Sequence, residues 1–147
     1  MELDARLNVA WRTLWLTLGL VPIVAGLDKF FNLLTNWEMY LNPLVPRMLH
    51  LSPAGFMHIV GVIEMVAGVL IFTRWTRFAA YLVMVWLCAI ALNLITQGRF
   101  LDVAVRDLVI ATGAFTLAKL TEVREAWIVR ESSGAVAVLQ QTRDRLA

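Results

Sequence analysis

The fold of this chain is decided by a stretch that begins at Pro53 and ends at Thr73, PAGFMHIVGVIEMVAGVLIFT, in which Glu64 has the only formal charge. Its length is close to the ~20 residues that a helix needs to cross a ~30 Å hydrocarbon layer. Ser52 just before it and Pro53 at its start are typical of a helix N-terminus. The stretch therefore predicts a membrane-spanning helix.

Three other apolar stretches of similar length lie on either side of this one. They run from about Thr13 to Leu34, from Phe78 to Thr96 and from Val103 to Leu120. Gly98 and Asp102 lie between the last two stretches, where a helix end and a helix cap are expected. The sequence thus predicts an all-α protein, an integral membrane four-helix bundle formed by residues 1–120.

The composition of the whole chain agrees with a membrane protein. Of its 147 residues, 60% are hydrophobic and 16% are charged, against about 45 to 50% and about 25% in soluble domains. A soluble domain of this size buries only about two thirds of the surface that its unfolded chain exposes, so it cannot hide so many apolar side chains. Basic and acidic residues nearly balance, with a net charge of +2, which argues against a nucleic-acid-binding protein. The single cysteine, Cys88, excludes an internal disulfide.

Two segments lie outside the predicted spans. The segment between the first two spans has aromatic residues and prolines among leucines, which favours a position in the membrane interface: Trp37, Tyr40, Pro43 and Pro46. Residues 121–147 form a charged tail that we expect to be partly helical, with a break at residues 132–134. Its last part has a weak heptad pattern for a partner helix, formed by Ala135, Leu139, Thr142 and Leu146.

Lysine and arginine are unequally distributed between the two sides of the four predicted crossings. Four of the 13 lie on one side, namely Lys29, Arg47, Arg99 and Arg106. The other nine lie on the side of the two termini, namely Arg6, Arg12, Arg74, Arg77, Lys119, Arg124, Arg130, Arg143 and Arg145. Basic residues are enriched in cytoplasmic loops, so we expect both termini and the tail to be cytoplasmic.

Several polar side chains lie inside the predicted spans, where an ionised group costs at least about 2.5 to 3.5 kcal/mol at the helix centre. Lys29, Glu64 and Asp107 share helical spacing with glycines or alanines. Helices pack closely along such small residues, so these three should point into the bundle. A rise of about 1.5 Å per residue places them in the outer half. We predict one buried polar cluster there, consisting of Asp28, Lys29, His58, Glu64, Asn93, Arg106 and Asp107.

Each member of this cluster also has a simpler interpretation. Lys29 and Arg106 can extend to the lipid headgroups. Glu64 can form a hydrogen bond or ion pair that orients its helix, or stay protonated. His58 and Asn93 can be packing residues. The two histidines lack a matching carboxylate spacing, so we expect no metal site, and no nucleophile motif assigns a catalytic residue.

A series of different short motifs is distributed over the spans, namely Leu18-Gly19-Leu20-Val21, Gly26-Leu27-Asp28-Lys29, Val62-Ile63-Glu64 with Gly68 and Arg74, Asn93, and Arg106-Asp107. This series resembles the DoxX-like family of small four-helix bacterial membrane proteins over roughly residues 12–120. The resemblance implies a multi-pass protein of the bacterial cytoplasmic (inner) membrane, sometimes assembled with redox partners. Relatives of this type include the DoxD-type subunit of thiosulfate:quinone oxidoreductase.

Two functions of different class are compatible with these features. The first is an accessory or structural subunit of a larger respiratory or redox complex, without intrinsic cofactor or activity of its own, whose partners are membrane lipid and other membrane-protein subunits. The alternative is a subunit whose His58, Glu64 and Lys29 or Arg106 hydrogen-bond a quinone or a phospholipid headgroup, and which takes part in quinone reduction and proton transfer. No redox centre is visible in the sequence, so electrons would have to come from a partner. This favours the first function.

Overall fold

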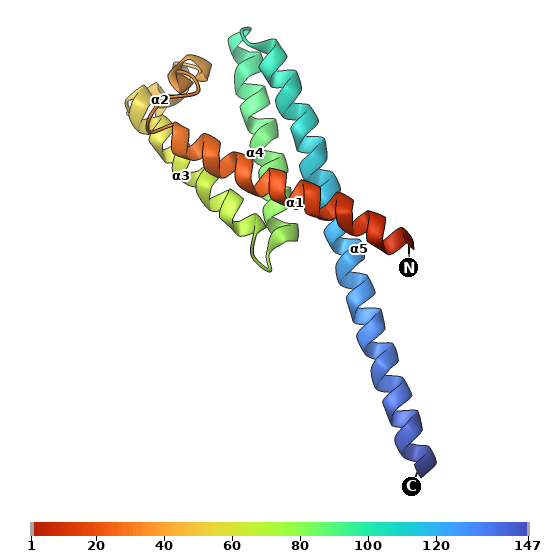
Figure 1. The fold of residues 1–147 in the computed structure, drawn as a ribbon. Helices are drawn as coiled ribbons and strands as arrows, with labels where there is room; N and C mark the ends of the chain where they lie inside the picture. Colours follow the sequence, from red (N-terminus) through yellow and green to blue (C-terminus); the bar gives the residue numbers. More distant parts are fainter. Residues whose placement is uncertain (1, 147) are drawn as a thin grey trace.

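The computed structural model describes the backbone of residues 2–146, and the side chains of this range except those of residues 2–4, 135–139, 142–143 and 145–146. The predicted heptad stripe of the tail therefore lies outside the described side chains. Within residues 2–146 the chain has helices and no strands, which confirms the all-α prediction. The helices are α1 (Glu2–Asp28), the short η1 (Trp37–Tyr40) and α2 (Leu44–Met48), α3 (Pro53–Ile71), α4 (Thr76–Gln97) and α5 (Leu101–Leu146) (Figure 1).

In the described part of the chain, three helices are long and apolar enough to cross a membrane. They are α1 from Ala5 to Asp28, α3 and α4, and only 17%, 39% and 28% of their apolar windows is buried within the chain. The remaining apolar surface requires an apolar surrounding, so the chain is a membrane protein. The predicted crossing in α5 is not among the three, since Arg106, Asp107 and Lys119 raise its charge.

The helix ends follow from local residues. α3 begins where the Ser52 hydroxyl accepts a hydrogen bond from the Gly55 N–H at 3.1 Å, with Pro53 in the first position. α1 ends at Asp28, before the expected edge at Leu34. There the Asp28 carboxylate accepts hydrogen bonds from the backbone N–H groups of Leu33 and Leu34. These bonds stabilise a turn in place of further helix.

α5 is one continuous helix, including residues 132–134 where we expected a break. The hydroxyls of Ser132 and Ser133 donate to the carbonyl oxygen of Val129 at 2.8 and 2.9 Å, so they are satisfied inside the helix. Gly134 costs only about 1 kcal/mol relative to alanine. The second half of α5 consequently extends beyond the other helices (Figure 1).

The four long helices form two neighbouring pairs, α1 with α3 and α4 with α5. We name the two ends of the molecule by the chain that connects the helices there. The turn end has residues 72–75 between α3 and α4, and the loop end has residues 29–52 between α1 and α3. The two pairs diverge toward the loop end (Figure 1).

The main hydrophobic core lies toward the turn end and receives residues from all four long helices: Leu18, Ala67, Ile71, Ala79, Ala80, Val83, Ala114, Leu117 and Ala118. A smaller core lies toward the loop end and belongs to α4 and α5 alone: Ala91, Leu94 and Ala104. Tyr40 of η1 packs against this smaller core. The two helix pairs therefore share a core at the turn end, and the loop takes part in packing at the other.

Glycines bring α1 and α3 close together at two levels. A Cβ atom on Gly61 would lie 2.5 Å from the carbonyl oxygen of Gly26, and one on Gly68 would lie 2.5 Å from that of Gly19. No side chain fits at such a distance, which is the usual reason for glycine between close membrane helices. The added Cβ on Gly61 would also lie 3.2 Å from the Cβ of Lys29. The close contact thus brings Lys29 against α3.

Candidate functional site

An ion pair between Lys29 and Glu64 lies at the loop end, between α1 and α3. The Lys29 Nζ donates a hydrogen bond to Glu64 Oε2 over 2.6 Å. The two side chains are 4% and 10% exposed, so the pair is buried. Charges of opposite sign at this distance compensate each other where neither could remain alone in an apolar surrounding.

Trp37 of η1 covers this ion pair and connects it to Asp28. The Lys29 Nζ lies 3.8 Å from the centre of the Trp37 ring, a cation–π contact. The Trp37 indole N–H donates to Asp28 Oδ2 over 2.8 Å. Together with the N–H groups of Leu33 and Leu34, it satisfies both oxygens of the Asp28 carboxylate. We call Asp28, Lys29, Trp37 and Glu64 the polar cluster, since these contacts connect its members to one another.

Asn93 of α4 holds the loop at a second place. Its side-chain oxygen accepts a hydrogen bond from the Asn42 N–H at 3.2 Å, and its side-chain amide donates to the Tyr40 carbonyl oxygen at 2.8 Å. Asn93 is half-buried, and neither of these two hydrogen bonds involves Lys29 or Glu64. Its position therefore serves the loop and not the ion pair.

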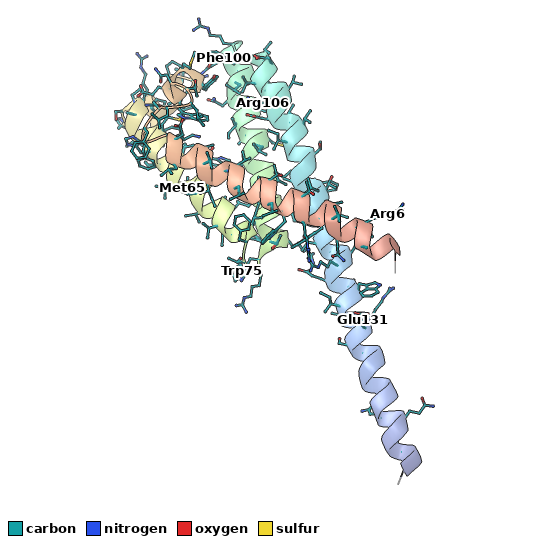
Figure 2. All side chains as sticks on the ribbon, in the orientation of Figure 1. Arg6, Met65, Trp75, Phe100, Arg106 and Glu131 are labelled. Atoms are coloured by element: carbon teal, nitrogen blue, oxygen red, sulfur yellow. The ribbon has the colours of Figure 1, made fainter. Side chains whose placement is uncertain are left out.

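His58 and Arg106 are both exposed. His58 stacks on Phe30, with ring centres 4.7 Å apart and an interplanar angle of 4°. The Arg106 side chain is 66% exposed and lies on α5 toward the loop end (Figure 2). Of the seven residues that we grouped from sequence, the structure thus brings Asp28, Lys29 and Glu64 together and leaves these two outside.

Asp107 is buried without being part of the polar cluster. It is 7% exposed, and its ion-pair partner is Arg106, whose Nε lies 3.6 Å from Asp107 Oδ1. This distance is too long for a good hydrogen bond. Among the candidate residues, Asp107 is the buried one whose hydrogen-bonding capacity is least used.

Polar contacts at the turn end were not predicted from sequence. The indole N–H of Trp15 donates to the Ile71 carbonyl oxygen at 2.8 Å, and that of Trp11 donates to the Thr121 hydroxyl at 2.8 Å. The Thr76 hydroxyl donates to the same Ile71 oxygen at 2.9 Å. In the sequence these contacts appear only as tryptophans near the end of a span. Tryptophans that face lipid have the same position, so the sequence does not distinguish the two.

Glu122 anchors α5 to α4 just beyond the turn-end core. Its carboxylate accepts hydrogen bonds from Lys119 Nζ at 2.9 Å and from the Tyr81 hydroxyl at 2.8 Å, and Arg77 Nε lies 3.3 Å away. The hydrogen bond from Lys119, followed by that from Tyr81, lowers the pKa of Glu122 from its ordinary value. Glu122 therefore stays ionised near neutral pH.

The polar groups at the loop end contact one another and the loop. In the part of the chain that the structure describes, no three His, Cys, Asp or Glu side chains gather in a way that could hold a metal ion. The ammonium of Lys29 and the carboxylates of Asp28 and Glu64 already have partners inside the cluster. The site can hold the loop over the end of α1 and the middle of α3.

The family model of DoxX matches residues 11–96, which is more than half of the chain. The chain therefore belongs to the DoxX family, as the sequence motifs predicted. The matched range includes Asp28, Lys29, Glu64 and Asn93, and it ends before Arg106 and Asp107. No curated protein and no solved structure matches the chain.

Proposed function

We propose that this DoxX-family chain crosses a bacterial inner membrane four times, with both termini and the distal part of α5 in the cytoplasm. Residues 103–120 of α5 support the fourth crossing, since Ala104, Ala111, Ala114 and Leu117 are buried and α5 packs along α4. A helix paired along a membrane span shares its depth. The excess of lysine and arginine on the side of the termini supports the orientation.

We further propose that the chain acts as an accessory or structural subunit of a larger respiratory or redox membrane complex. The observation that supports this function is that the charged groups of the polar cluster are paired with one another and with the loop. Lys29 is engaged by Glu64 and by the Trp37 ring, and Asp28 is engaged by Trp37 and two backbone N–H groups. Groups that are satisfied in this way hold a structure in place and leave little for a substrate.

The exposed part of α5 is the surface that best suits a partner subunit. After Glu122 the helix leaves the bundle with apolar side chains on its surface, among them Val123, Trp127, Ile128 and Val129, each at least 47% exposed. Exposed apolar side chains of this size in one short segment mark interaction surfaces. Arg124 at the start of this segment stacks on Trp11 of α1, 4.2 Å from its ring centre.

Truncation of α5 tests this proposal. A chain that ends at Glu125 keeps the contacts of Thr121, Glu122 and Arg124 and should insert and fold as before. In mild detergent, the full chain should migrate with other membrane subunits from its native membrane, and the truncated chain should migrate alone. Mass spectrometry of the complex then identifies flavin-, haem- or quinone-dependent partners. A full chain that migrates alone contradicts the proposal.

The alternative function, binding of a quinone or lipid headgroup with proton transfer, has Asp107 as its supporting observation. A buried carboxyl with unused hydrogen-bonding capacity can, when protonated, donate a hydrogen bond to a carbonyl oxygen, and it can exchange that proton. Asp107→Asn should then abolish quinone-dependent turnover of the isolated complex, while Asp102→Asn, an exposed residue on the same helix, should not. Equal turnover in the two variants would remove this alternative.

A further inference from the structure

A shallow pocket lies at the turn end, on the opposite end of the molecule from the polar cluster. It has a volume of about 460 Å³ and is lined by Arg74, Trp75, Arg77, Phe78 and Tyr81. These residues come from the α3–α4 turn and the first turns of α4, where Figure 2 labels Trp75. Two arginines and three aromatic rings therefore surround one open space.

Both arginines have N–H donors left for an anion, with the charge of Arg77 shared with two glutamates. Arg74 is exposed and forms no ion pair within the described residues. The Arg77 side chain is 53% exposed and directs Nε toward Glu122 and one terminal nitrogen toward Glu125, at 3.3 and 3.7 Å. A guanidinium has five N–H donors, so the other terminal nitrogen of Arg77 remains free to bind an anion beside Arg74.

The aromatic residues and the surface of α4 indicate that this anion is part of a lipid. Trp75 is 53% exposed, and tryptophan rings concentrate at the level of the headgroups; Phe78 beside it is 59% exposed. From Phe78, exposed apolar side chains continue along one face of α4 at helical spacing, at Leu82 and Val85. An anion bound at the arginines would thus have an apolar track next to it, which suits an acyl chain.

We propose that the turn-end pocket binds an anionic phospholipid. Its phosphate accepts hydrogen bonds from Arg74 and Arg77, its headgroup lies against Trp75, and an acyl chain follows Phe78, Leu82 and Val85. Arginine suits phosphate because its planar guanidinium presents paired donors. Basic pockets beside membrane helices at the cytoplasmic face bind anionic headgroups for the same reason. This site goes beyond the proposed subunit function, since it neither uses the polar cluster nor requires a partner protein.

Native mass spectrometry of the full chain, released from vesicles with equal amounts of phosphatidylglycerol and phosphatidylcholine, tests the proposal. We expect the unaltered chain to retain phosphatidylglycerol preferentially. Arg74→Gln should lower that preference about fivefold, the effect of losing one basic contact at the membrane surface. Arg77 is left unchanged because it also anchors α5 through Glu122.

The matched control is Arg99→Gln, which removes an exposed arginine from the turn between α4 and α5 at the loop end. This variant should keep the preference, and inorganic phosphate should not displace the lipid. The proposal is overturned if Arg74→Gln keeps the preference, if Arg99→Gln loses it equally, or if inorganic phosphate displaces the lipid. Circular dichroism of each variant confirms that its helices are intact.

Discussion

The two ends of the molecule are held together by different means. At the turn end, small and branched apolar residues of α1, α3, α4 and α5 form one core, and Ala79, Ala114 and Leu117 are fully buried in it. At the loop end, the α1–α3 and α4–α5 pairs have no such common core. There, the buried Lys29–Glu64 pair and the contacts of Asn93 with the loop connect the elements.

This difference has a physical reason. Lipid tails are as apolar as leucine, so packing of membrane helices depends on close contact between small residues. Alanines at the turn end permit that contact between all four long helices. At the loop end the helix pairs diverge, and a polar residue with a buried partner then provides the strongest specific contact. The loop end should thus respond to loss of polar groups, and the turn end to changes of volume.

The largest effect is expected from Lys29→Met, which leaves the Glu64 carboxylate buried without its cation. Removing one partner of a buried ion pair costs about 3–5 kcal/mol of unfolding free energy. Unfolding in detergent micelles, followed by circular dichroism, measures this loss. The control, Arg99→Met, changes an exposed side chain in the α4–α5 turn that forms no ion pair within the described residues, and it should have little effect. Equal stability of the two variants would show that the ion pair does not hold the loop end.

The double variant Lys29→Met/Glu64→Leu separates the pair from the packing around it. Apolar replacement of both partners of a buried ion pair is often neutral or stabilising. The double variant should therefore recover most of the stability lost by Lys29→Met, in the same unfolding measurement. If it is as unstable as the single variant, the space between α1 and α3 requires the shapes of these two side chains and not their charges.

A second effect, about 1–3 kcal/mol, is expected from Gly68→Ala at the turn end. The added Cβ would lie 2.5 Å from the backbone oxygen of Gly19, so α1 and α3 must move apart. The matched control is Gly113→Ala on α5, whose Cβ would lie 3.9 Å from Leu14, an ordinary contact. We expect no loss for Gly113→Ala, because alanine also favours helix. Both are compared by their unfolding midpoints, and equal midpoints would argue against close α1–α3 contact.

A smaller and local effect is expected from Asn93→Ala. It removes the hydrogen bonds to Asn42 and Tyr40, each worth about 1 kcal/mol. Limited proteolysis should cleave residues 29–52 faster, while the unfolding midpoint changes little. Trp15→Phe, which removes the hydrogen bond to Ile71 at the turn end, should leave cleavage of this loop unchanged. Faster loop cleavage in both variants would mean that the two ends are coupled.

The smallest effect concerns pH at Glu122. Hydrogen bonds from Lys119 and Tyr81 hold the pKa of Glu122 below its ordinary 4.5, so their stabilisation is complete above that value. It is lost as the pH falls through the lowered pKa. Lys119→Gln should move the pKa back toward 4.5, measured by carbon-13 NMR of the labelled carboxyl group. An unchanged titration would exclude Lys119 as the main cause.

The elements that could be predicted from the sequence are those set by local pattern. The spacing of Gly61, Glu64 and Gly68 places Glu64 on the face of α3 that contacts α1, and the structure has Glu64 there. The start of α3 at Ser52 and Pro53 is equally local. Family membership, too, was visible in short motifs.

The rest depends on chain geometry that no local pattern states. α1 ends at Asp28 because that carboxylate binds the backbone that follows it, and this turn brings Trp37 over Lys29. An aromatic residue in an interfacial segment gives no sign of which buried cation it will cover. For the same reason, His58 could not be separated from the polar cluster by spacing alone, although it stacks on Phe30 at the exposed edge.

The unbroken course of α5 has a mechanical consequence. At about 1.5 Å per residue, the helix from Leu120 to Leu146 is roughly 40 Å long. Because the helix is this long, a small tilt at its base displaces its C-terminal end by several ångströms. The base is clamped by Glu122 and by Arg124 on Trp11. A partner bound at the C-terminal end would therefore be mechanically coupled to the membrane-spanning helices.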